Sequence, residues 1–184
     1  MHVIDLIITV VWIVFWIYWI AAAMRTKATR TRSASSVPIR IAVIVLVLLL
    51  LRGGVFNGHP SATITNAWLQ GIGLAVFLLG LAFAVWARIY LGRNWGRPMS
   101  QKVDPELVTT GPYRYVRHPI YSGIIVGTIG TTMAISLYWL VAVVLLSGYF
   151  IYSATVEERN MERLFPDTYP AYKRSTKMLV PFIF

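Results

Sequence analysis

Long apolar stretches separated by short polar segments dominate the hydrophobic pattern of this chain. A stretch of about 20 apolar residues is long enough to cross the hydrocarbon core of a membrane as a helix. The pattern therefore predicts an all-α fold, an integral membrane bundle of five transmembrane helices in a single membrane domain, 1–184. The expected spans are about 3–24, 39–56, 66–91, 121–135 and 137–155. Because only Ser136 separates the last two spans, we expect them to form a tight antiparallel hairpin.

The distribution of basic residues predicts the orientation of these spans. All but one of the 17 Lys and Arg residues fall between spans one and two, near or between spans three and four, or after span five. The exception is Arg52. Basic residues concentrate on the cytoplasmic side of membrane proteins. We therefore predict the N-terminus outside and the C-terminus in the cytoplasm.

Composition argues against several classes of protein and of site. The formal net charge of +10 is explained by topology and by contact with anionic membrane lipids, so we expect no nucleic-acid partner. The chain has no Cys, which excludes disulfides and thiol nucleophiles. Its 3 His and scattered acids lack the spacing of metal ligands, so we expect no metal. No basic residue precedes the first apolar run, which argues against a secretory signal.

One polar segment stands directly before the fourth span, and it reads LVTTGPYRYVRHPIYSG over residues 107–123. Gly111 and Pro112 predict a turn. Pro119 suits the first turn of a helix, where its missing N–H has no cost, and it pushes His118 toward an extended backbone. Gly123 and Gly127 have the spacing of close helix packing, although room for a bulky ligand against the helix is an alternative.

A second polar segment follows the fifth span. It begins with the acidic pair Glu157 and Glu158, continues through Tyr169 and Tyr172 to a basic pair, and ends in an apolar stretch. Such an apolar ending suggests a tail that folds back against the membrane surface. We therefore expect a cytoplasmic pocket built from the 92–120 segment and this tail.

These two segments resemble the isoprenylcysteine carboxyl methyltransferase family, whose core motif is Gly-x-Tyr-x-x-x-Arg-His-Pro-x-Tyr-x-Gly. The motif matches Gly111, Tyr113, Arg117, His118, Pro119, Tyr121 and Gly123. The family also carries a Glu-Glu pair, a Tyr-x-x-Tyr, a basic pair and a Leu-x-Pro-Phe-like end, as this tail does. The Arg88–Trp95 stretch is similar to the family's approach to the motif, so the likeness covers about 71–184, the expected catalytic core.

The resemblance implies methyl transfer from S-adenosylmethionine to a lipid-like or prenylated acceptor that enters from the bilayer. A carboxylate acceptor, such as that of an isoprenylcysteine, needs a cation to hold it rather than a base. On this basis Arg174, Glu158 and Arg117 are the expected catalytic residues. The expected cofactor-binding residues are Tyr113, His118, Pro119, Tyr121, Gly123, Glu157 and Glu158.

Other functions stay open at this point. Relatives with similar tails methylate phospholipid amines, and more distant ones are sterol reductases that use NADPH. A membrane subunit without enzyme activity is a third alternative. Pro166 and Pro170 depart from the family pattern and could change how the tail folds back.

Overall fold

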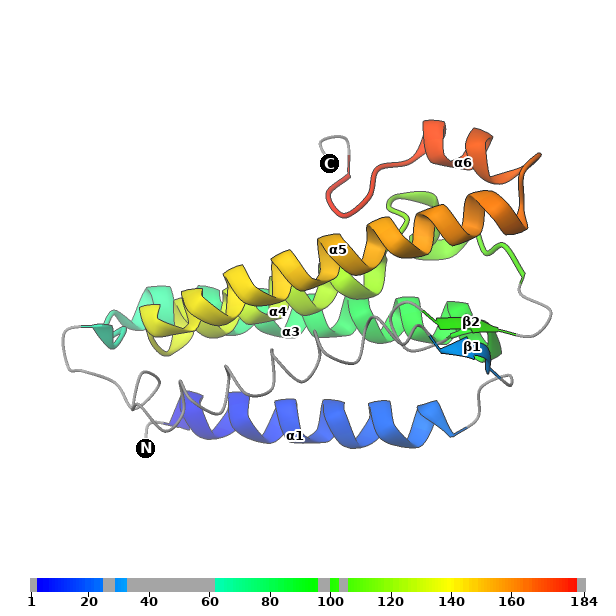
Figure 1. The fold of residues 1–184 in the computed structure, drawn as a ribbon. Helices are drawn as coiled ribbons and strands as arrows, with labels where there is room; N and C mark the ends of the chain where they lie inside the picture. Colours follow the sequence, from blue (N-terminus) through cyan, green and yellow to red (C-terminus); the bar gives the residue numbers. More distant parts are fainter. Residues whose placement is uncertain (1–2, 25–28, 33–61, 96–99, 103–105, 182–184) are drawn as a thin grey trace.

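The computed structural model describes residues 3–24, 29–32, 62–95, 100–102 and 106–181, and this part of the chain is mostly helical (Figure 1). The long helices are α1 (Val3–Ala23), α3 (Ala67–Leu91), α4 (Pro119–Ala134) and α5 (Leu140–Leu164). The short elements are η2 (Gly92–Asn94), η3 (Gly111–Arg114), η4 (Leu137–Trp139) and α6 (Tyr169–Ser175).

A short two-stranded ribbon departs from the helical fold among the described residues. Strand β1 (Thr29–Arg32) pairs antiparallel with β2 (Ser100–Lys102), with a register shift between Thr29 and Thr31. The prediction of an all-α fold missed this pairing. Both strands lie in polar segments outside the predicted spans, where no apolar pattern signals them.

Three of the described helices are long and apolar enough to cross a membrane: Val3–Ala23, Ala67–Asn94 and Leu137–Leu164. They coincide with the first, third and fifth predicted spans. The helix α4 replaces the predicted fourth span but has only 16 residues, or about 24 Å at 1.5 Å per residue. The predicted span 39–56 lies outside the described residues. Five spans and their orientation therefore remain predictions.

Glycines bring α3 and α4 into close contact. A Cβ atom built on Gly123 would come within 2.6 Å of the Gly80 carbonyl oxygen, and one on Gly73 within 2.6 Å of the Ala134 nitrogen. Gly127 faces Leu81 across the same interface. Small residues let helix backbones approach in this way, and the gain is van der Waals packing along both helices. The packing interpretation of Gly123 and Gly127 is therefore the one that the structure supports.

The connection after α4 forms the predicted hairpin. The Ser136 side chain caps η4 by accepting a hydrogen bond of 3.3 Å from the Tyr138 N–H. The chain then reverses, and α5 runs back beside α4 (Figure 1). Its 25 residues extend about 38 Å, which exceeds the roughly 30 Å hydrocarbon core. We therefore expect the charged end of α5, which starts at Glu157, to project beyond the membrane-spanning part.

The tail after α6 folds back onto the start of α4 (Figure 1). The Arg117 N–H donates to the Lys177 carbonyl at 2.8 Å, and the His118 N–H donates to the Met178 carbonyl at 3.1 Å. The Ser122 hydroxyl adds a bond of 2.6 Å to the Leu179 carbonyl. Hence the tail supplies a partner for the backbone N–H of His118, the N-cap residue of α4, and for that of Arg117 just before it.

Gly80→Ala should lower the free energy of unfolding by about 1–3 kcal/mol, because its methyl group would overpack the α3–α4 interface. The built Cβ atom lies 2.8 Å from the Gly123 carbonyl oxygen. Gly71→Ala is the matched control in the same helix, since no heavy atom lies within 4 Å of its Cβ position. Thermal unfolding of both variants in detergent measures the difference, and equal melting temperatures would contradict the packing argument.

Candidate active site

The motif segment reaches the end of α3 through a tight turn. Gly111 has φ of +59°, a conformation that side chains rarely adopt, and its Cβ position lies 2.7 Å from Cζ of Tyr90 in α3. A side chain at this position would strain the backbone and would require the Tyr90 ring to move. The turn leads into η3, which buries Tyr113, and then to His118 and Pro119 at the start of α4.

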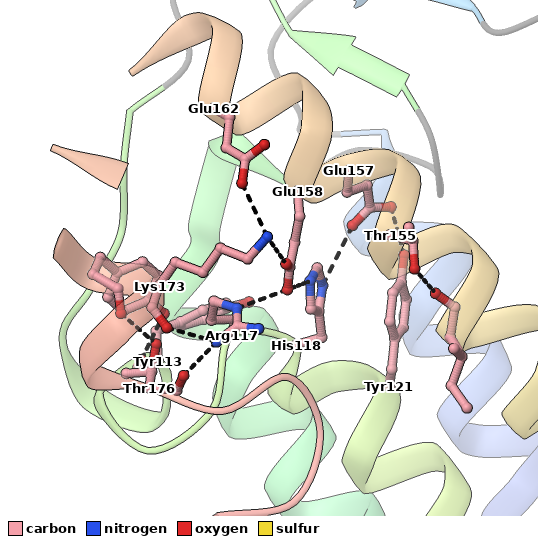
Figure 2. A network of polar contacts seen from close by, with 12 residues as sticks. Tyr113, Arg117, His118, Tyr121, Thr155, Glu157, Glu158, Glu162, Lys173 and Thr176 are labelled. Atoms are coloured by element: carbon pink, nitrogen blue, oxygen red, sulfur yellow. Dashed lines mark hydrogen bonds and ion pairs between the residues drawn. The ribbon is translucent and has the colours of Figure 1, made fainter. Parts of the chain in front are cut away.

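Glu158 is the centre of the polar network that forms beside this segment (Figure 2). Its side chain is only 3% exposed, yet it is surrounded by cationic donors. Arg117 Nε donates to Glu158 Oε1 at 2.7 Å, and Lys173 Nζ lies 3.0 Å from Oε2. Burial alone raises the pKa of Glu158, but contacts with His118, Arg117 and Lys173 outweigh it and lower the pKa to about 2. Glu158 is therefore a carboxylate at neutral pH.

Arg117 connects this carboxylate to the tail (Figure 2). Besides Glu158, its guanidinium donates through Nη1 to the carbonyls of Lys173, at 3.2 Å, and Thr176. Lys173 also binds Glu162 at 2.9 Å, and these hydrogen bonds to Glu162 and Glu158 raise the pKa of Lys173. The network thus joins the start of α4, the end of α5 and α6.

His118 lies between the two glutamates of the acidic pair (Figure 2). Its Nδ1 is 3.5 Å from Glu157 Oε2, and its Nε2 is 3.5 Å from Glu158 Oε1. The second contact lacks hydrogen-bond geometry, so Nε2 is buried without a hydrogen-bond partner among the described residues. The imidazole thus keeps one buried nitrogen that faces the Glu158 carboxylate and makes no hydrogen bond within the described residues.

Aromatic rings extend the site along α4 and α5. The rings of His118 and Tyr121 are stacked at 5.4 Å, and those of Tyr121 and Phe150 at 4.4 Å. The Tyr121 hydroxyl donates to Glu157 Oε1 at 2.6 Å. This arrangement places a carboxylate at the edge of an aromatic stack, and both groups attract cations.

Tyr113 closes the site on the side of the tail. Tyr172 donates its hydroxyl to the Tyr113 carbonyl at 2.6 Å. Burial raises the pKa of the Tyr113 phenol, Tyr172 and Glu157 add to the rise, and Arg88 opposes it. The phenol therefore stays protonated and can donate a hydrogen bond.

An open cavity of about 380 Å³ adjoins this network between the motif segment and α6. Two of its lining residues, Tyr172 and Thr176, also contact Tyr113 and Arg117 of the network. The other lining residues are Thr109, Arg114, Ala171 and Ser175. A ligand could thus reach the network from beside α6.

Most of the residues predicted from the sequence lie together in the structure. Arg117, His118, Tyr121, Glu157 and Glu158 form one network, and Tyr113 and Pro119 lie against it. Among the predicted residues, Arg174 and Gly123 lie apart from it. Arg174 is exposed on α6, and Gly123 packs against α3. Their predicted contacts with substrate and cofactor stay predictions.

The sequence reasoning missed three participants. It assigned no role to Lys173, which binds Glu158, or to Phe150, whose ring stacks on Tyr121. It also assigned none to Thr176, whose carbonyl accepts a hydrogen bond from Arg117. Spacing could have indicated Phe150, because Phe150 and Glu157 are seven residues apart and so share a helix face. The Thr176 contact uses a backbone carbonyl, which no side-chain pattern signals. No group of His, Cys, Asp and Glu suited to a metal ion occurs among the described residues.

Comparison with known proteins identifies the family. Residues 68–168 match the sequence profile of the family described as Phospholipid methyltransferase, which is more than half of the chain. The chain belongs to this family. The family resemblance predicted from the motif is confirmed, because its relatives include isoprenylcysteine methyltransferases.

Two relatives with known sequences show how far the similarity extends. The nickel-cobalt-cadmium resistance protein NccN of Alcaligenes xylosoxydans xylosoxydans is 32% identical over 119 residues, which are 63% of this chain and 53% of NccN. Protein-S-isoprenylcysteine O-methyltransferase B of Arabidopsis thaliana is 27% identical over 120 residues, 63% of this chain and 61% of the plant protein.

The solved structure of a eukaryotic intramembrane Ras methyltransferase, an isoprenylcysteine carboxyl methyltransferase, has a TM-score of 0.59 and 25% identity. The similarity covers 84% of this chain and 55% of that one. The chain thus spans a little over half the length of each of these three proteins. The likeness supports an integral membrane protein with the architecture of this methyltransferase.

Acidification should destabilise the wild-type protein more than Glu158→Gln. The pKa of Glu158 is lowered from 4.5 to about 2 by folding, so its stabilising contribution is complete above pH 4.5 and is lost as the pH falls toward 2. Glu158→Gln should cost about 3 kcal/mol at pH 7, because Arg117 stays buried without its counter-ion. Melting temperatures in detergent from pH 7 to pH 3 test this, and parallel curves would refute it.

Proposed function

We propose that this protein transfers a methyl group from S-adenosylmethionine to a membrane-associated, lipid-like acceptor. The favoured acceptor is a carboxylate such as that of an isoprenylcysteine. The strongest support is the network of Arg117, His118, Glu157 and Glu158. Its members come from the motif segment and from the acidic pair of α5, and both lie in the region that matches a methyltransferase family. This network lies where the apolar part of α5 ends.

The residues of the network fit the proposed cofactor. The carboxylate of Glu157 and the stacked rings of Tyr121 and Phe150 suit the positive charges of S-adenosylmethionine. His118 Nε2 and the Tyr113 phenol are polar groups that a ligand could engage. When bound, S-adenosylmethionine would supply a methyl group on a positively charged sulfur. An acceptor carboxylate oxygen would bond to the methyl carbon as the carbon–sulfur bond breaks, so a neutral thioether would leave and no proton would be released.

The protein contributes position and charge rather than a covalent step. Glu158 and Arg117 fix each other, and Arg117 also binds two tail carbonyls, so the tail is held against the start of α4. Holding reactants in a near-attack geometry is itself a large source of rate enhancement. Pro119, buried at the first position of α4, shapes the wall beside His118.

We further propose that the site faces the cytoplasm of a prokaryotic cell. The charge pattern of the sequence favours this orientation, and a soluble cofactor would then enter from the cytoplasm. A lipid-like acceptor would approach through the bilayer. Exposed apolar side chains on α5, including Val144, Ile151 and Tyr152, give this helix a surface compatible with lipid.

A phospholipid amine is the second candidate acceptor. The name of the matching family, Phospholipid methyltransferase, favours it, and an amine must lose a proton when it is methylated. His118 Nε2, buried without a hydrogen-bond partner among the described residues, is a group that could accept that proton. A carboxylate acceptor requires no such base.

His118→Ala and Glu158→Ala should each weaken binding of radiolabelled S-adenosylmethionine to the purified protein at least tenfold. The first removes a buried nitrogen that has no hydrogen-bond partner among the described residues, and the second releases Arg117 and Lys173 from their positions. Glu162→Ala is the control one turn along α5, where the side chain is 43% exposed and its ion pair contributes little. Unchanged binding in both site variants would overturn the cofactor assignment.

A further inference from the structure

Arg88 is a buried cation that the polar network described above does not use. It lies in the last turn of α3 and is 4% exposed. Its Nη2 donates to the Ala22 carbonyl at the end of α1, and its Nη1 donates to the Gly92 carbonyl, both at 2.8 Å. The guanidinium also lies over the Trp95 ring, 4.7 Å from its centroid.

The charge of Arg88 has no full counter-charge in the described part of the chain. No carboxylate there lies within ion-pair distance of Arg88, and its Nε is buried without a hydrogen-bond partner. Carbonyls at helix ends supply only partial negative charge. Arg88 also belongs to an apolar helix, Ala67–Asn94, that is long enough to cross a membrane. Ionisable residues in such helices are costly, and they commonly mark a functional site.

Arg88 lies at the same end of α3 as the candidate active site. Tyr90, two residues along, packs against Gly111 of the motif turn. The Tyr113 phenol interacts electrostatically with Arg88 and also with Glu157. The site therefore has a positive group on α3 in addition to the carboxylates on α5.

We propose that Arg88 binds the carboxylate of the methyl acceptor. This inference rests on the proposed function, since it assigns a residue to the acceptor of that reaction. A bound carboxylate would supply the missing counter-charge and an acceptor for the unpaired N–H. It would do so away from bulk water, where a charge-assisted hydrogen bond is stronger.

The other cations near the site are less suited to this role. Arg117 already donates to Glu158 and to two carbonyls, and Lys173 pairs with two glutamates. Arg174 is exposed on α6, where water competes for its charge. Beside Arg88, the rings of Trp19 and Trp95 meet at 5.9 Å, which offers an apolar surface to the hydrocarbon part of an acceptor.

The test compares two ligands of similar shape that differ at one group: S-farnesylcysteine with a free, negatively charged carboxylate, and the same compound as its neutral carboxamide. Methyl transfer to the first is measured with radiolabelled S-adenosylmethionine, and the carboxamide is measured as a competitive inhibitor. Arg88→Gln, Arg88→Lys and wild type are compared in detergent. Arg93→Gln is the matched control, because Arg93 is an exposed cation in the adjoining η2.

We expect wild type to bind the carboxylate ligand more tightly than the carboxamide. Arg88→Gln should raise the KM for S-farnesylcysteine about 30-fold or more, with kcat changed much less. Arg88→Gln should bind the two ligands alike, whereas Arg93→Gln should discriminate as wild type does. Arg88→Lys, which keeps the charge without the planar fork, should recover part of the preference. Unchanged binding of S-adenosylmethionine shows that a variant is folded, so a general structural defect cannot imitate this pattern.

Two outcomes would overturn the inference in different ways. Suppose that wild type methylates S-farnesylcysteine and that both Arg88 variants still bind the carboxylate more tightly than the carboxamide. Arg88 then does not bind the acceptor. The same conclusion follows if the variants lose binding of S-adenosylmethionine but still prefer the carboxylate. If wild type transfers no methyl group to S-farnesylcysteine, the proposed acceptor is wrong and the inference fails with it.

Discussion

A carboxylate buried at the end of an apolar helix is the constraint on which the site depends. Glu158 is almost inaccessible, and an isolated charge in such a place would be prohibitively costly. Arg117, His118 and Lys173 remove that cost, and they come from the start of α4 and from α6. Satisfying one buried charge therefore brings together segments that are about forty to sixty residues apart in the sequence.

The close contact of α3 and α4 gives this network a rigid base. Glycines on both helices allow the backbones to touch, and the motif turn packs its own glycine against Tyr90 of α3. The beginning of α4 is thus positioned from two directions, by α3 beneath it and by the tail above it. Because His118 and Arg117 lie at this beginning, helix packing far into the bundle sets the geometry of polar groups at its end.

The distribution of charge within the site suits the proposed chemistry. The carboxylates of α5 lie beside rings that stack between α4 and α5, and a cationic methyl donor would be favoured there. Arg88, which has no carboxylate partner in the described part of the chain, lies on α3, where an anionic acceptor would be favoured. Separated charges of this kind can orient two oppositely charged reactants toward each other, which is the main task of a protein in a direct displacement.

The sequence by itself determined the membrane class, the ends of α1 and α3, and most members of the network. Apolar length and motif spacing depend on neighbouring residues, so they can be read along the chain: Pro119 marks the start of α4, and Glu157 marks the point where α5 becomes polar.

The spacing could not show which cation pairs with Glu158. The fold brought Arg117 and Lys173 to it and left Arg174 exposed. It also showed that Gly123 packs against a helix and that Arg88 is buried without a carboxylate partner in the described residues. Burial and pairing are properties of contacts between distant segments, and for that reason only the tertiary structure decided them.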